Sequence, residues 1–356
     1  MMAFLISPVV TRANLWVREC LGLKPWRIGG FIAMVAAIGN AQPFHFPTAN
    51  QKLLEPGRED EFFVGTIGKP WPSGTFGCVR SEGWKFHEGL DIRCQQRDKR
   101  GEPIDPVMAT ADGVVSYVNR KPGLSNYGNY VILKHVIDGV AVFSLYAHLR
   151  SIRSDLAAGL SVKQGEEIGV LGRTTNTREG ISRDRAHVHF ELNLMLTERF
   201  DQWYRKDHPK DRNDHGNWNG RALAGLDPQA VFLAQQQQGQ NFRFLTFIQN
   251  QTEMFRAYIT GNRLPWLDRY PSLLRPNPVA NREGTAGFEV AINYAGVPYQ
   301  ITPRAASELP PQGKLRLLSV NGEEYKRHPC RRLIRFQGKR WELTAAGTDL
   351  LELLAF

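Results

Sequence analysis

Stretches that alternate between apolar and polar residues dominate the middle of the chain. From residue 63 to residue 233 they mix β-branched with aromatic side chains and are separated by Gly, Asn and Asp; the clearest are residues 113–118, 130–135, 141–146 and 188–192. A period of two is typical of strands with one buried face. Asp138 and Gly139 lie between two of these stretches and predict a tight hairpin turn. We therefore expect residues 63–233 to be mainly antiparallel β-sheet.

Three neighbouring segments lack this alternation. Residues 42–62 contain three prolines and predict an irregular N-terminal segment. Residues 197–224 are rich in Asp, Arg, Asn and His, which predicts a long surface insertion because too few apolar residues remain for strands. Residues 234–240 are Gln-rich, and such low complexity indicates a linker between two domains.

The C-terminal residues, 241–356, predict a smaller α+β domain. Apolar residues between 244 and 259 have roughly helical spacing, and a short apolar helix is expected at the end of the chain. Strands are expected over residues 287–293, 314–320 (followed by a turn at residues 321–322), 333–336 and 341–343. This region carries no chemical motif, and its basic residues fit either contact with an anionic wall or a solvated strand face.

The first 41 residues have the parts of a secretory signal. Basic residues precede an apolar run over residues 28–38, and the small Gly39 and Ala41 suit cleavage before Gln42. The run is short for a bilayer span, so a cleaved signal peptide is favoured over an uncleaved anchor or a buried helix. A signal over residues 1–41 predicts a secreted protein, either periplasmic or extracellular.

The net charge of +10 over 356 residues favours acidic partners, namely nucleic acid, anionic lipid or a carboxylate-rich cell wall. Nucleic-acid binding would require an aromatic and basic platform and an intracellular address. The apparent signal peptide disfavours that address, so no nucleic-acid partner is expected.

Cysteine usage leaves two alternatives. Cys20 lies in the leader, and Cys78, Cys94 and Cys330 remain in the body of the chain. Cys78 and Cys94 flank one predicted strand pair and could form a disulfide in an oxidising compartment, or all three thiols could be free and buried.

Histidines and one aspartate supply the candidate chemistry. His187 and His189 are two residues apart on a predicted strand, so both side chains share one face. They could bind a metal, one could bind while the other acts as a base, or both could be polar residues on a solvated face. His87 and Asp91 flank a glycine at the start of another strand, and their nitrogen and oxygen donors suit Zn²⁺. His148 ends a third strand, where a lone His is usually structural.

Taken together, these segments resemble the LytM/lysostaphin-type zinc metalloendopeptidases. The resemblance covers about residues 63–233 and rests on the motifs His-x-x-x-Asp at 87–91, Tyr-x-His-Leu at 146–149 and His-x-His at 187–189, with supporting segments at 111–115, 127–131 and 162–169. It implies an antiparallel β-sheet groove and Zn²⁺ ligands at His87, Asp91 and His189. It also implies that the catalytic positions are His148 and His187 and that the substrate is the peptide part of bacterial peptidoglycan.

The implied reaction uses a zinc-activated water, with His148 and His187 as proton acceptors or donors, and which of the two is the base stays open. Glu88 and Glu191 are either partners of the ligands or surface carboxylates. His208 and His215 are interpreted as surface residues. The charged approach at residues 178–186 and the insertion at 197–224 depart from the family pattern. The alternative to an active enzyme is a catalytically silent or autoinhibited wall-binding protein on the same fold.

Overall fold

The computed structural model describes residues 42–308 and 313–356. The predicted signal peptide, residues 1–41, lies outside them. Among the described residues, no helix is both long and apolar enough to cross a bilayer.

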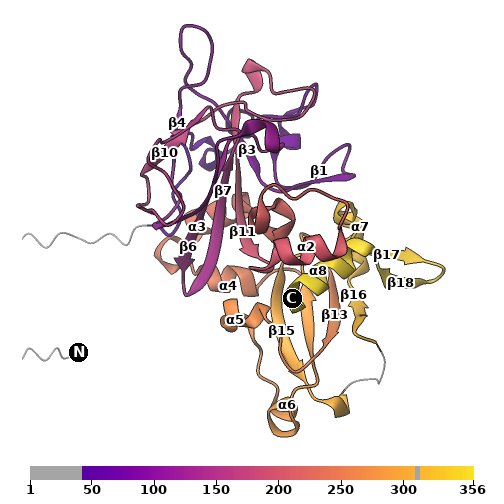
Figure 1. The fold of residues 1–356 in the computed structure, drawn as a ribbon. Coiled ribbons are helices and arrows are strands. Elements are labelled where there is room, and N and C mark those ends of the chain that lie inside the picture. The colour runs from indigo at the N-terminus through magenta and orange to yellow at the C-terminus, as the bar shows by residue number, and fades with distance from the viewer. Residues whose placement is uncertain (1–41, 309–312) are drawn as a thin grey trace, which may run out of the picture. The chain divides into compact units, whose positions relative to one another are not determined.

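A seven-stranded antiparallel sheet forms the centre of the N-terminal half (Figure 1). Its strands are β3 (Leu90–Arg93), β5 (Gly113–Asn119), β6 (Tyr130–Ile137), β7 (Val140–Ala147), β9 (Ser161–Val162), β11 (His187–Met195) and β12 (Leu223–Leu226). The order is β12-β11-β7-β6-β5-β9, and β3 pairs with β11 beside β12. The predicted hairpin is confirmed: Asp138 and Gly139 join β6 to β7 with φ angles of 51° and 77°. The mainly antiparallel β fold expected from the alternation is thus the observed one.

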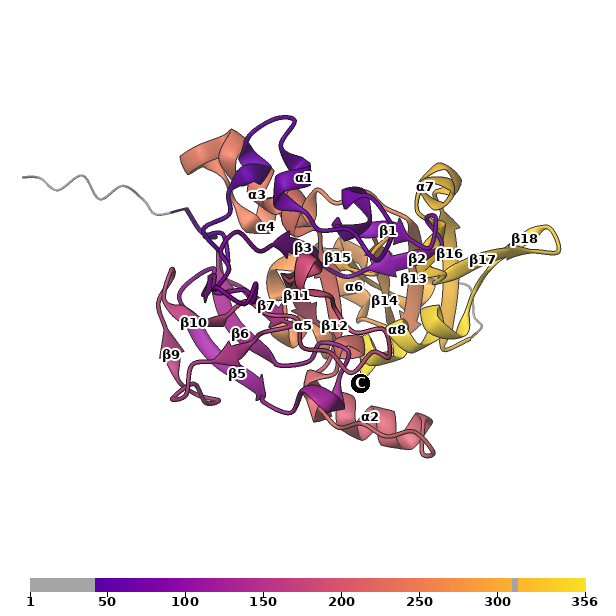
Figure 2. The same ribbon diagram turned by 90° about the horizontal axis from the view of Figure 1, so that it is seen from above.

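Smaller elements surround this sheet. One sheet contains β4 (Pro106–Met108), β10 (Glu167–Val170) and β8 (Ser151–Ile152), and β1 (Gly77–Arg80) pairs with β2 (Lys85–His87). The helices here are α1 (Glu59–Phe62), α2 (Phe200–Asp207) and α3 (Pro228–Gln238). Figure 2 shows the β1–β2 hairpin between the central sheet and the C-terminal elements.

The C-terminal region is built on a four-stranded antiparallel sheet in the order β15-β14-β13-β16. The strands are β13 (Phe255–Thr260), β14 (Gly287–Ile292), β15 (Pro298–Arg304) and β16 (Leu315–Val320), and a separate hairpin contains β17 (Ile334–Gln337) and β18 (Arg340–Leu343). The helices are α4 (Phe244–Gln249), α5 (Trp266–Arg269), α6 (Pro278–Glu283), α7 (Gly322–Arg327) and α8 (Ala345–Ala355).

The predicted linker at residues 234–240 was wrong. Helix α3 continues to Gln238, and Gln235 is buried with both ends of its amide bonded to the Phe44 backbone, at 2.9 Å from Phe44 N to Oε1 and 2.7 Å from Nε2 to Phe44 O. The Gln run is therefore structural. Phe232 on the same helix stacks on Phe46 and Phe190, and one hydrophobic core runs from the central sheet into the C-terminal region.

Two other predictions require correction. The supposed surface insertion at 197–224 contains α2, which buries Phe200, Trp203 and Tyr204, because aromatic residues three and four apart form one apolar helix face. The helix expected over 244–259 ends at Gln249, and residues 255–260 form strand β13 instead. Within β13, Phe255, Ala257 and Ile259 are more deeply buried than the residues between them.

The turn expected at residues 321–322 is instead a helix start. The Asn321 side chain accepts a hydrogen bond from Glu324 N at 3.1 Å and caps α7.

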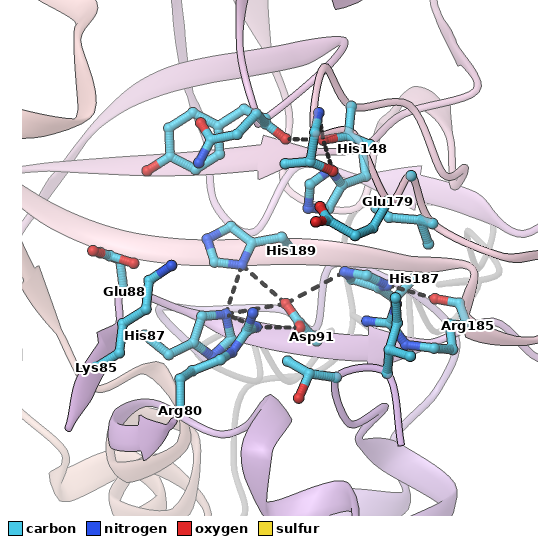
Figure 3. Close-up of a pocket in the computed structure, with 18 of the residues that line it drawn as sticks. Arg80, Lys85, His87, Glu88, Asp91, His148, Glu179, Arg185, His187 and His189 are labelled. Carbon is cyan, nitrogen blue, oxygen red and sulfur yellow. Dashed lines mark hydrogen bonds and ion pairs between the residues drawn. The ribbon is translucent and has the colours of Figure 1, made fainter. Parts of the chain in front are cut away.

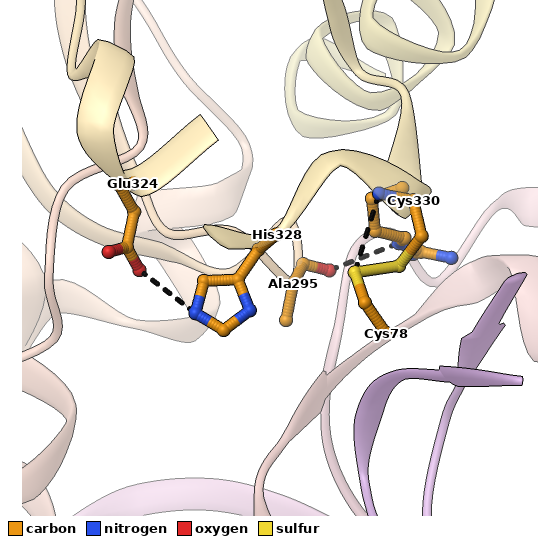
Figure 4. Close-up of a disulfide and its surroundings, with 6 residues drawn as sticks. Cys78, Ala295, Glu324, His328 and Cys330 are labelled. Atoms are coloured by element: carbon orange, nitrogen blue, oxygen red, sulfur yellow. Dashed lines mark hydrogen bonds and ion pairs between the residues drawn. A yellow bond between two sulfur atoms is a disulfide. The ribbon is translucent and has the colours of Figure 1, made fainter. Parts of the chain in front are cut away.

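Neither of the two alternatives for the cysteines, a Cys78–Cys94 disulfide or three free thiols, is observed. Cys78 is bonded to Cys330, 252 residues away (Figure 4). Cys94 is a buried free thiol. The Cys94 thiol instead donates a hydrogen bond to Asp105 Oδ2 at 3.1 Å. Strand β1 turns Cys78 toward the C-terminal region, so a distant cysteine and not the near one becomes its partner.

Candidate metal centre

Strand register assembles the site. In β11, His189 lies opposite Asp91 of β3 on one side and opposite Ala147 of β7 on the other. The next residue of the chain after Ala147 is His148, and His187 lies on the same face of β11, so the sheet itself places three of the other four candidate side chains around His189. The remaining one, His87, ends β2 just before the chain enters β3.

Gly89 permits this tight entry. A Cβ at this position would lie 2.3 Å from the Phe190 carbonyl oxygen, so any other residue would push β3 away from β11. Close packing against β11 therefore requires a glycine between His87 and Asp91, and this close approach keeps both side chains directed at His189.

Three donor atoms converge at the floor of the groove (Figure 3). His87 Nε2 lies 3.0 Å from His189 Nδ1, His189 Nδ1 lies 3.0 Å from Asp91 Oδ1, and His87 Nε2 lies 3.1 Å from Asp91 Oδ1. Zn²⁺ bonds of about 2.0–2.2 Å in a tetrahedral site separate neighbouring donors by about 3.3–3.6 Å. The triangle therefore needs to widen by only a few tenths of an ångström, and two His with one carboxylate is a zinc-type donor set.

The outer atoms of both ligand imidazoles are already bonded. His87 Nδ1 donates to the Thr75 carbonyl at 2.7 Å, so its Nε2 carries the lone pair that a metal would use; in this structure that lone pair accepts a hydrogen bond from Arg80 Nη2 at 2.7 Å. His189 Nε2 donates to Glu191 Oε1 at 2.9 Å, which leaves its Nδ1 lone pair. Glu191 is buried and also accepts from Tyr127 Oη at 2.7 Å. These contacts fix the ring orientations and tautomers that metal binding requires.

Electrostatics keeps the aspartate ionised. Burial alone would raise the pKa of Asp91, but the adjacent imidazoles and the Arg80 guanidinium hold it well below its usual range. Arg80 Nη2 donates to Asp91 Oδ2 at 2.6 Å, so the carboxylate presents Oδ1 to the other ligands. Burial lowers the pKa of His189, but hydrogen bonds to the Asp91 and Glu191 carboxylates outweigh it and raise the pKa to about 9.

His148 and His187 form a second pair above the ligands. Their ring centroids are 4.9 Å apart, and His187 Nε2 lies 3.5 Å from Asp91 Oδ1. His148 Nδ1 donates to the Thr174 carbonyl at 2.9 Å and His187 Nδ1 donates to the Arg185 carbonyl at 2.6 Å. Both Nε2 atoms are left for a substrate or water in the groove.

The backbone and charge state of this pair are unusual. His148 has a φ of 61°, a left-handed conformation that costs about 1–3 kcal/mol for a residue with a side chain. Backbone hydrogen bonds to Tyr127 O and from Thr174 N hold it there. Burial lowers the pKa of His187 to about 4 and that of His148 well below its usual range, so both rings are neutral and can accept a proton at neutral pH.

One known protein family matches the segment of the chain that contains these residues. Residues 85–201 match the family described as Peptidase family M23, and the match contains all five residues. Residues 85–201 thus form a segment similar to peptidase family M23. Among solved structures, the M23 segment is similar to the catalytic domain of lysostaphin from Staphylococcus simulans (24% identity, 33% of this chain and 74% of that one, TM-score 0.24). It is also similar to the catalytic domain of EnpA from Enterococcus faecalis (23% identity, 36% and 85%, TM-score 0.25).

Two curated relatives are similar to part of the chain. The DD-carboxypeptidase/endopeptidase Mpg of Neisseria meningitidis is 35% identical over 111 residues, which is 31% of this chain and 21% of that protein. The cell division protein DipM of Caulobacter vibrioides is 30% identical over 160 residues, 42% of this chain and 23% of that protein. The chain thus spans about a fifth of the length of the curated relatives it matches.

The M23 site contains residues that the motifs did not reveal. A pocket of about 470 Å³ holds the five motif residues, and Arg80, Lys85, Tyr127, Glu179 and Arg185 also line it. Glu191, left open between two roles, is a buried partner of His189, whereas Glu88 is partly exposed on the pocket wall and bonds to no ligand.

His208 and His215 lie apart from the donor cluster, and each is partly exposed. His215 Nδ1 bonds to Tyr117 Oη at 2.9 Å, and the His208 ring lies 4.8 Å from that of Tyr204. No sequence motif marked Arg80, and Tyr127 was included only in the supporting segment 127–131, with no role assigned to it.

Proposed function

We propose that this protein is a secreted zinc-dependent endopeptidase that hydrolyses peptide bonds in bacterial peptidoglycan. One observation carries the proposal: three zinc-type donor atoms, 3.0–3.1 Å apart, lie in a groove that is also lined by two neutral imidazoles, those of His148 and His187. His87, Asp91 and His189 would hold the metal, and His148 and His187 would be the catalytic residues. The family supports the class of reaction, and the signal-like residues 1–41 support export to the periplasm or beyond.

A bound Zn²⁺ would supply a Lewis acid that lowers the pKa of water to about 7 and polarises a carbonyl group. The chain's own residues move the protons. His148 and His187 are neutral, so either Nε2 can accept a proton from an attacking water and then donate it to the leaving amine. Hydrogen bonds from Nδ1 to backbone carbonyls keep each Nε2 directed into the groove. General acid–base catalysis of this kind contributes about 10²–10⁴-fold in rate.

The test is zinc content together with digestion of purified peptidoglycan. We expect about one zinc per chain and new peptide ends from the wild type, and loss of both in His189→Ala. His208→Ala is the matched control, because it removes a histidine outside the donor cluster and should change neither result.

Zinc without cleavage in the wild type would favour the silent or autoinhibited alternative. A folded wild type that takes up no zinc would refute the catalytic proposal.

A further inference from the structure

A second, smaller pocket opens beside the metal centre. It has a volume of about 180 Å³, equivalent to about six waters, and it shares Phe86, Glu88 and Tyr127 with the main groove. Its outer wall comes from the C-terminal region, chiefly from Arg331, Leu333 and Leu350. We call it the side pocket. Because the two pockets share a wall, a peptide bound at the metal centre can place one of its residues there.

Arg331 is the charged group of the C-terminal wall. Its guanidinium lies over the Phe86 ring at 4.9 Å, and its Nε donates to the Ala295 carbonyl at 3.2 Å. Within residues 42–308 and 313–356, its two terminal nitrogens have no hydrogen-bond partner and the guanidinium takes part in no ion pair. These nitrogens keep solvent contact, so an anion that enters the pocket can replace water there with charge-assisted hydrogen bonds.

The acidic residues nearby do not complete this cation. Glu191 already accepts hydrogen bonds from His189, Tyr127 and Asn193, and Asp349 is paired with Arg221 at 3.1 Å. Glu88 lines the side pocket but is not within ion-pair distance of Arg331. Burial lowers the pKa of Arg331, against the opposing field of Glu88 and Glu191. The donors therefore remain free for a ligand.

The fold holds Arg331 firmly at this place. The preceding residue, Cys330, is covalently bonded to Cys78, and Cys78 is the cross-strand partner of Phe86 in the β1–β2 hairpin (Figure 4). Phe86 in turn precedes the metal ligand His87. One disulfide and one cation–π contact thus join the guanidinium to the hairpin that carries a ligand, which pre-organises it for binding.

From these contacts we infer that the side pocket is a subsite for a free carboxylate of the substrate peptide, and that Arg331 binds this carboxylate. The inference rests on the proposed function and assigns the C-terminal region a role in substrate selection. A planar guanidinium binds a carboxylate through two parallel hydrogen bonds, a geometry that an amide cannot match.

The test compares two substrates. One is a cross-linked stem-peptide dimer isolated from peptidoglycan with its carboxylates free, and the other is the same dimer with those carboxylates converted to carboxamides. We expect the zinc-loaded wild type to prefer the free acid by about 10–100-fold in kcat/KM, mostly through KM. Arg331→Gln should lose activity on the free acid alone, so that its kcat/KM on the acid is about equal to its kcat/KM on the carboxamide. The preference of Arg331→Lys for the acid should lie between those of the wild type and Arg331→Gln.

Arg275→Gln is the matched control, because Arg275 is an exposed arginine of the same C-terminal region and is not among the residues that line either pocket. It should keep the wild-type ratio, whereas a structural role of Arg331 would reduce cleavage of both dimers equally. Cleavage of both dimers at equal rates by the wild type, a comparison that needs no variant, would overturn the inference and leave the proposed function standing. An unchanged preference for the free acid in Arg331→Gln would also overturn the inference alone. If the wild type cleaves neither dimer, both the inference and the proposed function are overturned.

Discussion

Glu191→Gln is the substitution that tests most directly how the sheet tunes the metal centre. The buried carboxylate accepts the Nε2 hydrogen of His189 at 2.9 Å and thereby makes Nδ1 a better donor. Hydrogen bonds to a charged group contribute about 1.5–3 kcal/mol, and neutral ones about 0.5–1.5. The difference, about 1–1.5 kcal/mol, corresponds to roughly tenfold weaker zinc binding. This is the lower end of the 10–100-fold range typical of such partners.

The size of this effect should depend on pH, with a sign that the structure determines. The pKa of His189 is raised to about 9, partly by Glu191, so at pH 7 zinc must displace a proton from the wild type. Glu191→Gln lowers that pKa and so reduces proton competition, which offsets part of the lost affinity below pH 9. We therefore expect the gap between variant and wild type to be small at pH 7 and to approach tenfold near pH 9.

The assay is competition for zinc between the metal-free protein and a chromophoric chelator at both pH values. Glu88→Gln is the control, because Glu88 faces the same pocket without bonding to a ligand. Circular dichroism before metal addition shows whether each variant is folded. Equal zinc affinity of Glu191→Gln and wild type at pH 9, or an equal loss in Glu88→Gln, would refute the reasoning.

Other parts of the molecule give separate expectations. His148→Gln and His187→Gln should each keep about one zinc per chain but lose about 10²–10⁴-fold in kcat, and zinc loss in either would contradict their placement outside the ligand set. Burial lowers the pKa of His135, so protonation favours unfolding and stability should fall as pH drops below about 6.5. Urea unfolding between pH 5 and 7.5 measures how the free energy of unfolding depends on pH, and in His135→Gln this dependence should be weaker by up to about 1.4 kcal/mol per pH unit. The same dependence in variant and wild type would disprove this prediction. Burial and Asp105 raise the pKa of the Cys94 thiol to about 12, so alkylation at pH 8, followed by peptide mapping, should be about 10³-fold slower in the folded than in the unfolded protein. Similar rates in both states would contradict this.

The sheet and the motifs that contain the candidate ligands could be recognised because both are features of local sequence. Strands β5, β6, β7 and β11 carry the alternation or β-branched content that marks them, and the hairpin at residues 138–139 needs only residues that tolerate positive φ. His187 and His189 share a face by the period of a strand. Such features require no knowledge of distant parts of the chain.

The errors arise where tertiary packing overrides local composition. Gln235 reads as part of a low-complexity run, yet its amide satisfies the buried backbone of Phe44, 191 residues earlier. Cys78 has a cysteine 16 residues away, yet it bonds to Cys330 across 252 residues. The local sequence around Gln235 and around Cys78 gives no sign of the distant partner of either residue. Composition therefore suggested a linker in the first case, and spacing suggested the wrong cysteine in the second.

The same distinction separates the chemistry of the site from its selectivity. The candidate ligands His87, Asp91 and His189 lie on strands β2, β3 and β11 and were found from short motifs, although β3 and β11 pair across 98 residues of chain. The groups that face a substrate around them, Arg80, Tyr127 and Arg331, come from separate strands and loops that only the folded chain brings together. Loops on a rigid sheet commonly carry specificity. We therefore expect a chain with the same five site residues and a different C-terminal region to keep the zinc chemistry and to select a different peptide.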